Sequence, residues 1–169
     1  MNKRSRKKMT LLARDIMEKE FDKIHASAPA SKAIEMILNG KVRATGHKTI
    51  SLIVVDGSSE LAGVVTMFDI LYHLRPSFLN RGISGEDLSW KGQIKDLIQE
   101  LEKKKVKQIM STNVVGAAPD EHLMVLLDRM VKNRYRRLPV LENQRPIGIV
   151  YISDVYFHLF TKLHDHQED

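Results

Sequence analysis

The sequence of 169 residues contains no cysteine. A disulfide scaffold, a zinc site built on thiolates and catalysis by a thiol are therefore excluded together. The absence of cysteine also fits a reducing compartment. Long apolar runs are missing as well, because nowhere do about 18 apolar residues follow one another, and residues 1–30 hold no signal-peptide core. We therefore expect a cytoplasmic protein with no membrane partner.

Signatures of catalysis are also missing. The chain shows neither a Walker loop that could cradle phosphates nor a Ser-His-Asp order. It has 7 histidines, and their densest group, His164-Asp165-His166, falls in a polar C-terminal tail. We therefore expect no catalytic residue, no metal site and no obligatory cofactor, and the chain is predicted not to be an enzyme.

Positive charge is concentrated at the N-terminus. The formal net charge is +6, and the first eight residues hold five basic side chains and no acid, namely Lys3, Arg4, Arg6, Lys7 and Lys8. Such an arm can hold phosphates without sequence specificity, but a solvated terminus is the simpler interpretation. No helix-turn-helix, zinc finger or aromatic-rich sheet accompanies it. Nucleic acid is therefore not the expected partner, and weak nucleic-acid binding through the arm stays an alternative.

What the chain does contain is an internal repeat. Four landmarks of the first half return in the same order in the second half. The pairs are Arg14–Met17 with Lys107–Met110, Ala28-Pro29 with Ala118-Pro119, Leu52–Asp56 with Leu138–Glu142, and Gly63–Ile70 with Gly148–Val155. Four matches in one order indicate a duplication, which constrains the whole fold.

Each copy predicts a strand, a helix, two strands and a second helix. Helical spacing of apolar residues recurs at Ala33, Ile34, Ile37 and Leu38 and at Leu123, Leu126, Leu127, Met130 and Val131, with Ser31 and Asp120 as expected N-caps. Continuously apolar strands are predicted over Ser51–Val55, Leu61–Val65, Leu138–Leu141 and Ile147–Tyr151. Neither copy can bury both faces of its small sheet alone. We therefore expect a mixed α+β or α/β fold in which the two copies pack sheet to sheet.

The repeat divides the chain into five segments. We expect a basic tail over residues 1–10, a first repeat over 11–75, a linker with a helix over 76–104, a second repeat over 105–163 and a C-terminal tail over 164–169. The linker helix starts at Gln93 and carries an apolar stripe from Ile94 to Leu101. Trp90, the single tryptophan, is expected to staple this helix rather than to stack on a base.

Nearly the whole chain, from Ala13 to Leu163, resembles a pair of CBS domains, the repeats named for cystathionine β-synthase. The resemblance rests on Asp15-Ile16-Met17 with its copy Gln108-Ile109-Met110, on Arg136-Arg137-Leu138-Pro139-Val140, and on the Gly-x-x-Thr-x-x-Asp signature at Gly63–Asp69 with its altered copy at Gly148–Asp154. It implies a pseudo-symmetric module with two clefts between the repeats. In many members a cleft holds AMP, ADP, ATP or another adenosyl ligand, and many members form dimers.

The signature at Gly63–Asp69 also has a physical rationale. A helix beginning near Thr66 offers unpaired amides and a positive dipole end to a phosphate, and Asp69 could accept hydrogen bonds from both ribose hydroxyls. The simpler alternative is a capping box between the two side chains, and the roles are compatible. The resemblance places Arg136 and Arg137 in the same cleft, where they would clamp phosphates. The alternative is that both arginines are solvated near a helix C-terminus, where basic side chains are favourable.

The second cleft would centre on Asp154. Tyr151 replaces the small hydroxyl residue there, and the counterpart of the two arginines is the uncharged pair Ile50-Ser51. We therefore expect one competent cleft and one weak or empty cleft.

The function that these observations favour is a regulatory sensor of an adenine nucleotide. AMP, ADP or ATP is the expected ligand, and NAD and S-adenosylmethionine rank behind them. The chain would signal by a conformational change or a dimer rearrangement, as a homodimer, to an effector protein whose identity the sequence does not give. The alternative is an adaptor that dimerises and binds no ligand.

Overall fold

The computed structural model describes residues 11–43, 46–82, 90 and 92–164, and the chain forms two compact units. One unit is Phe21–Val114. The other combines residues 11–20 with the chain from Val115 onward. The expected basic tail and the His164-Asp165-His166 group fall wholly or partly outside the described residues.

The unit Phe21–Val114 carries a mixed three-stranded sheet. Its elements are β1 (Lys23–His25), α2 (Ala30–Leu38), β2 (Ser51–Val55), β3 (Leu61–Thr66), α3 (Met67–Leu74), a 3₁₀ turn η1 (Ser77–Arg81), α4 (Gln93–Lys103) and α5 (Val106–Ile109). The strand order is β1-β2-β3, with β1 parallel and β3 antiparallel to β2. The β2–β3 turn is held by the Asp56 carboxylate, which accepts from the amides of Ser58 and Glu60. Strand, helix, strand, strand and helix therefore follow one another as the first repeat predicts.

The core of this unit lies between the sheet and its helices. Its buried residues are Ile24, Ala30, Ala33, Ile37, Leu52, Val54, Val65, Leu101, Val106 and Ile109. Leu101 belongs to the predicted linker helix, and Val106 and Ile109 belong to the start of the second repeat. The first repeat therefore completes its core with residues from beyond its own sequence boundary.

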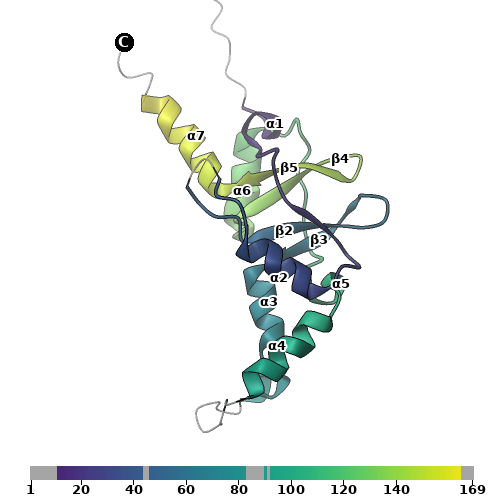
Figure 1. Cartoon of the computed structure of the whole chain (residues 1–169). Coiled ribbons are helices and arrows are strands. Elements are labelled where there is room, and N and C mark those ends of the chain that lie inside the picture. The colour runs from purple at the N-terminus through teal and green to yellow at the C-terminus, as the bar shows by residue number, and fades with distance from the viewer. Residues whose placement is uncertain (1–10, 44–45, 83–89, 91, 165–169) are drawn as a thin grey trace, which may run out of the picture. The chain divides into compact units, whose positions relative to one another are not determined.

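The second unit is built on a hairpin. Its elements are α1 (Ala13–Ile16), α6 (Leu123–Asn133), β4 (Arg137–Glu142), β5 (Arg145–Tyr151) and α7 (Ile152–His164), and Figure 1 shows α6 and α7 beside the β4–β5 hairpin. Asn143 and Gln144 both have positive φ angles, of 51° and 65°, as a two-residue hairpin turn requires. The first strand of this repeat is reduced to one parallel bridge between Ala117 and Val140. Gly116 and Pro119 flank this bridge, and both residue types weaken strands.

The segment that begins each repeat pairs with a strand of the other repeat. In the second unit, Glu18 pairs with Ile149 by hydrogen bonds of 2.8 and 3.0 Å between backbone atoms. In the unit Phe21–Val114, Ser111 pairs with Val64 in the same way, at 2.9 and 3.0 Å. The residue that follows the Ile-Met landmark of each repeat therefore pairs with the last strand of the other repeat.

Both predicted helix caps are wrong. The N-cap of α2 is Pro29 instead of Ser31, and that of α6 is His122 instead of Asp120. The first amide of α2 donates to the Lys104 carbonyl at 2.7 Å. The first amide of α6 donates to the Leu11 carbonyl at 2.8 Å. At α2 a backbone carbonyl distant in sequence therefore takes the place of the expected side-chain cap, whereas at α6 the His122 Nδ1 atom also accepts from the Met124 amide at 3.1 Å.

The predicted stripes of α2 and α6 are largely buried, with one exception on each helix. Leu38 at the end of α2 is 67% exposed and Val131 near the end of α6 is 62% exposed. Both lie in the C-terminal turn of their helix.

The predicted helix from Gln93 is present as α4, and Trp90 stacks on Phe78 with ring centroids 6.3 Å apart. In α4 the predicted apolar stripe is buried only at Leu101, whereas Ile94 and Ile98 are 53% and 38% exposed.

Candidate functional site

Thr66 and Asp69 form a reciprocal cap at the N-terminus of α3. The Asp69 Oδ2 atom accepts from the Thr66 amide at 2.8 Å and from the Thr66 hydroxyl at 2.7 Å. The Asp69 amide donates to Thr66 Oγ1 at 3.2 Å. The capping box that the sequence allowed is therefore present, and it holds both side chains in place at the helix end.

Ser111 is a third member of this group, and the sequence reasoning missed it. Its hydroxyl donates to Asp69 Oδ1 at 2.8 Å. The backbone pairing of Ser111 with Val64 brings it to the end of β3. A signal was available, because Ser111 directly follows the Ile109-Met110 landmark, and Glu18 follows Ile16-Met17 in the other copy.

The amides at the start of α3 differ in their partners. The Met67 amide donates to the Ile50 carbonyl at 3.1 Å, and the Asp69 amide donates to Thr66. The Phe68 amide has no acceptor among the residues that the structure describes. An N–H group at the positive end of a helix dipole favours an anion.

His73 lies one helical turn after Asp69 on α3. Burial lowers the pKa of His73 below its ordinary value, and the nearby Lys104 ammonium lowers it further, against the opposing effect of Asp69. The imidazole is therefore held in its neutral form at neutral pH.

The remaining predicted residues gather at the N-terminus of α7 in the other unit. The Arg136 carbonyl accepts from the amide of Ile152, the first residue of α7, at 3.0 Å. Arg137 opens β4 opposite Tyr151, and Asp154 lies in the first turn of α7. The Arg136 side chain is exposed, whereas Arg137 and Asp154 are half-buried.

The two helix N-termini are built alike but carry different side chains. Ile50 and Arg136 play the same backbone role, since each carbonyl accepts from the first amide of the following helix. Tyr151 occupies the position that Thr66 has in the first repeat, and it is only 7% exposed. The α3 end therefore has hydroxyl groups and a carboxylate, and the α7 end has two arginines, a carboxylate and a buried ring.

No group of three or more His, Cys, Asp or Glu side chains able to hold a metal ion occurs among the described residues. Within the same residues, no helix combines the length and the apolar character needed to cross a bilayer.

Comparison with known proteins identifies the repeat. The CBS domain model matches residues 13–76 and 106–160, whereas no curated protein matches the chain. One similar structure is the CBS domain of a CBS-domain-containing membrane protein from Sphaerobacter thermophilus, with 23% identity over 87% of this chain and 86% of that one and a TM-score of 0.66. Another is CBSX2 in complex with AMP, with 22% identity, coverage of 89% and 97%, and a TM-score of 0.64.

A third similar structure is the CBS domain pair of protein MJ0100 in complex with 5-methylthioadenosine and S-adenosyl-L-methionine. It shares 22% identity over 90% of this chain and 98% of that one, with a TM-score of 0.62. These likenesses show the fold, which confirms the mixed helix and strand architecture of a tandem CBS pair. Because the family model covers more than half of the chain in two copies, the chain belongs to the CBS domain family.

Proposed function

We propose that the chain is a regulatory sensor that binds an adenine nucleotide at the Thr66–Asp69 end of α3 and catalyses no reaction. The observation that carries the proposal is the group of Thr66, Asp69 and Ser111, in which one carboxylate already accepts three hydrogen bonds. The AMP and S-adenosylmethionine complexes of the similar CBS structures support an adenosyl ligand.

The chemistry of this end suits a ribose phosphate. A ribose hydroxyl can replace the Ser111 hydroxyl as donor to Asp69 Oδ1, and the released Ser111 hydroxyl can then accept from the sugar. The Phe68 amide supplies a donor for a phosphate oxygen. Charge-assisted bonds of this kind are worth about 1.5–3 kcal/mol each.

We further propose that Arg136 and Arg137 bind phosphate groups and that Asp154 marks a second, weaker site. The arginine fork matches phosphate oxygens in a bidentate manner. At Asp154 the buried Tyr151 ring stands where a small hydroxyl would donate. We propose AMP, ADP or ATP as the ligand, ahead of NAD and S-adenosylmethionine, and a cytoplasmic location in keeping with the cysteine-free composition.

Calorimetric titration with AMP, ADP and ATP tests the sensor. The Asp69→Asn variant keeps the size of the cap but removes its charge, and we expect it to weaken binding by about tenfold or more. Asp154→Asn is the matched control, at the same position of the other final helix, and should leave the main affinity unchanged. The proposal fails if none of the three nucleotides binds, or if Asp69→Asn binds as the wild type does.

The exposed faces of α3 and α7 support a homodimer. Met67, Phe68, Leu71 and Tyr72 on α3 are 46–75% exposed, and Tyr156, Phe157 and Phe160 on α7 are 47–60% exposed. Contiguous exposed apolar side chains mark interaction surfaces. We propose that a second copy covers these faces and that nucleotide binding changes the surface offered to an effector protein.

Light scattering tests the proposed homodimer. Phe68→Glu combined with Phe157→Glu should give a monomer, whereas Leu38→Glu, at an exposed leucine of α2, should leave a dimer. A dimer that binds no nucleotide would favour the adaptor, and a wild-type monomer would refute the proposed assembly.

A further inference from the structure

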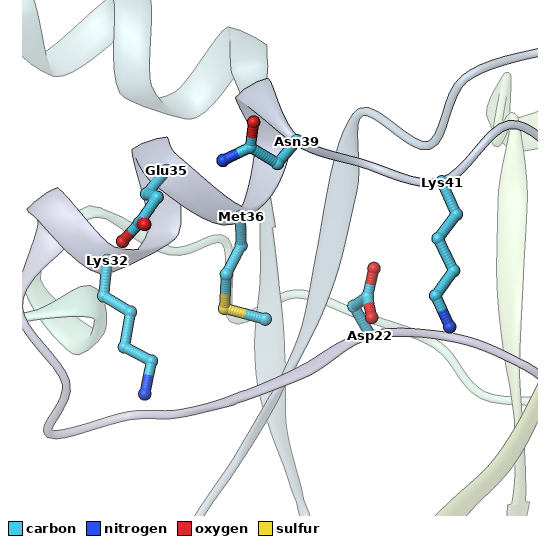
Figure 2. A pocket seen from close by; sticks show the side chains of 6 residues that line it. All are labelled: Asp22, Lys32, Glu35, Met36, Asn39 and Lys41. Carbon is cyan, nitrogen blue, oxygen red and sulfur yellow. The ribbon is translucent and has the colours of Figure 1, made fainter.

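A pocket of about 320 Å³ lies within the unit Phe21–Val114, away from the cap of α3. It opens between α2 and the segment that enters β1, as Figure 2 shows. This volume falls at the lower end of the range for small-molecule sites. The lining residues are Asp22, Lys32, Glu35, Met36, Asn39 and Lys41.

The charges in this pocket balance but do not pair. Two carboxylates and two ammonium groups line it, yet none of the four forms an ion pair or hydrogen bond through its side chain with another described residue. Elsewhere the chain does pair such neighbours, as in Lys103 with Glu100 at 2.8 Å. Lys32 and Glu35 have the same helical spacing and leave their charges available to a ligand.

Charged side chains lie at both ends of the pocket, with an apolar side chain between them. Figure 2 shows Asp22 and Lys41 at one end, with Lys32 and Glu35 at the other. The Met36 side chain lies between them and is half-buried. The pocket therefore offers a carboxylate and an ammonium at one end, followed by the apolar Met36 side chain.

This pattern selects a dipolar ligand. A nucleotide carries several negative charges, and a lining whose two carboxylates balance its two ammonium groups offers it no net attraction. An α-amino acid carries an ammonium and a carboxylate on one carbon, which match Asp22 and Lys41, and its side chain would run along the methionine floor. We propose that this pocket binds a free α-amino acid with an unbranched side chain.

The proposal is independent of the nucleotide site, because the two sites share no residue. A chain with both sites would respond to two signals of different chemistry.

Titration of the full chain with L-methionine tests the proposal. We expect saturable binding that Asp22→Asn and Lys41→Gln each weaken by about tenfold, through loss of a charge-assisted hydrogen bond. Lys107→Gln, at an exposed lysine of α5 outside the pocket, is the matched control and should bind as the wild type does.

Two blocked probes identify the groups that are recognised. N-acetyl-L-methionine lacks the ammonium and L-methionine methyl ester lacks the carboxylate, and neither should bind measurably. Lys41 is exposed, so its variant keeps the fold and a negative result is interpretable. The proposal is overturned if L-methionine, L-norleucine and L-glutamine all fail to bind at millimolar concentration, or if the pocket variants bind as the control does.

Discussion

At the residue scale, Asp69 combines a structural role with the proposed binding role. Its carboxylate closes the first turn of α3 through Thr66 and also accepts from Ser111, which belongs to the start of the second repeat. A binding group that is already held by two partners loses little freedom when a ligand arrives. The structural cap therefore also pre-organises the proposed site.

His73 gives a prediction at the same scale. Because the folded state lowers the pKa of His73, its neutral form contributes stability that is present above the ordinary value of 6.5 and is lost as the pH falls through the lowered pKa. We predict that the unfolding free energy, measured with urea, falls on acidification below neutrality and that His73→Gln reduces this fall. His47→Gln, at an exposed histidine, is the control, and an identical pH profile in the wild type and His73→Gln would contradict the assignment.

At the element scale, the glycine of one repeat accommodates the methionine of the other. A Cβ on Gly63 would lie 2.5 Å from the Ser111 carbonyl oxygen and 3.1 Å from Met110 Sδ. A Cβ on Gly148 would lie 2.5 Å from Met17 Sδ. The two landmarks of the sequence are therefore in contact, each repeat's glycine with the other repeat's methionine.

These contacts predict a graded set of stabilities. Gly63→Ala should cost about 1–3 kcal/mol, because the backbone at Ser111 must shift. Gly148→Ala should cost less, because a flexible methionine side chain can move instead. Gly57→Ala, where a Cβ meets nothing within 4 Å, should be neutral or slightly stabilising. Urea denaturation measures all three, and equal effects at Gly63 and Gly57 would contradict the packing.

Local pattern predicted the elements but could not predict what caps them. The stripe from Leu123 to Met130 and the apolar runs of β2 and β4 are visible in the sequence because their period is local. The first amides of α2 and α6 donate to the carbonyls of Lys104 and Leu11, and no local pattern predicts an acceptor so far along the chain. Thr66 and Asp69 form a motif in the sequence. The place of Ser111 after the Ile109-Met110 landmark is visible too, but it does not by itself show that Ser111 pairs with a strand of the other repeat.

At the scale of the whole molecule, compact units and sequence repeats do not coincide. The repeats run over 13–76 and 106–160, whereas the first compact unit continues to Val114 and begins only at Phe21. Its core needs Leu101, Val106 and Ile109. The repeats therefore reflect a duplication of the sequence, whereas the compact units show which segments must fold together.

Two fragments of the chain test whether the compact unit or the sequence repeat is the part that folds alone. A fragment Phe21–Val114 should fold, with dispersed amide resonances and a cooperative thermal transition, because it contains its complete core. A fragment of residues 11–75 should remain unfolded, since it lacks α4 and α5. A folded 11–75 fragment, or an unfolded Phe21–Val114 fragment, would contradict this division.

A nucleotide that occupies the Thr66–Asp69 end of α3 must change the amide chemical shifts of the residues there. In an NMR titration of the ¹⁵N-labelled chain with AMP, ADP and ATP, we predict the largest shift changes at Phe68, Asp69 and Ser111. Saturable shifts confined to other residues, or no shift changes with any of the three nucleotides, would contradict the proposed nucleotide site.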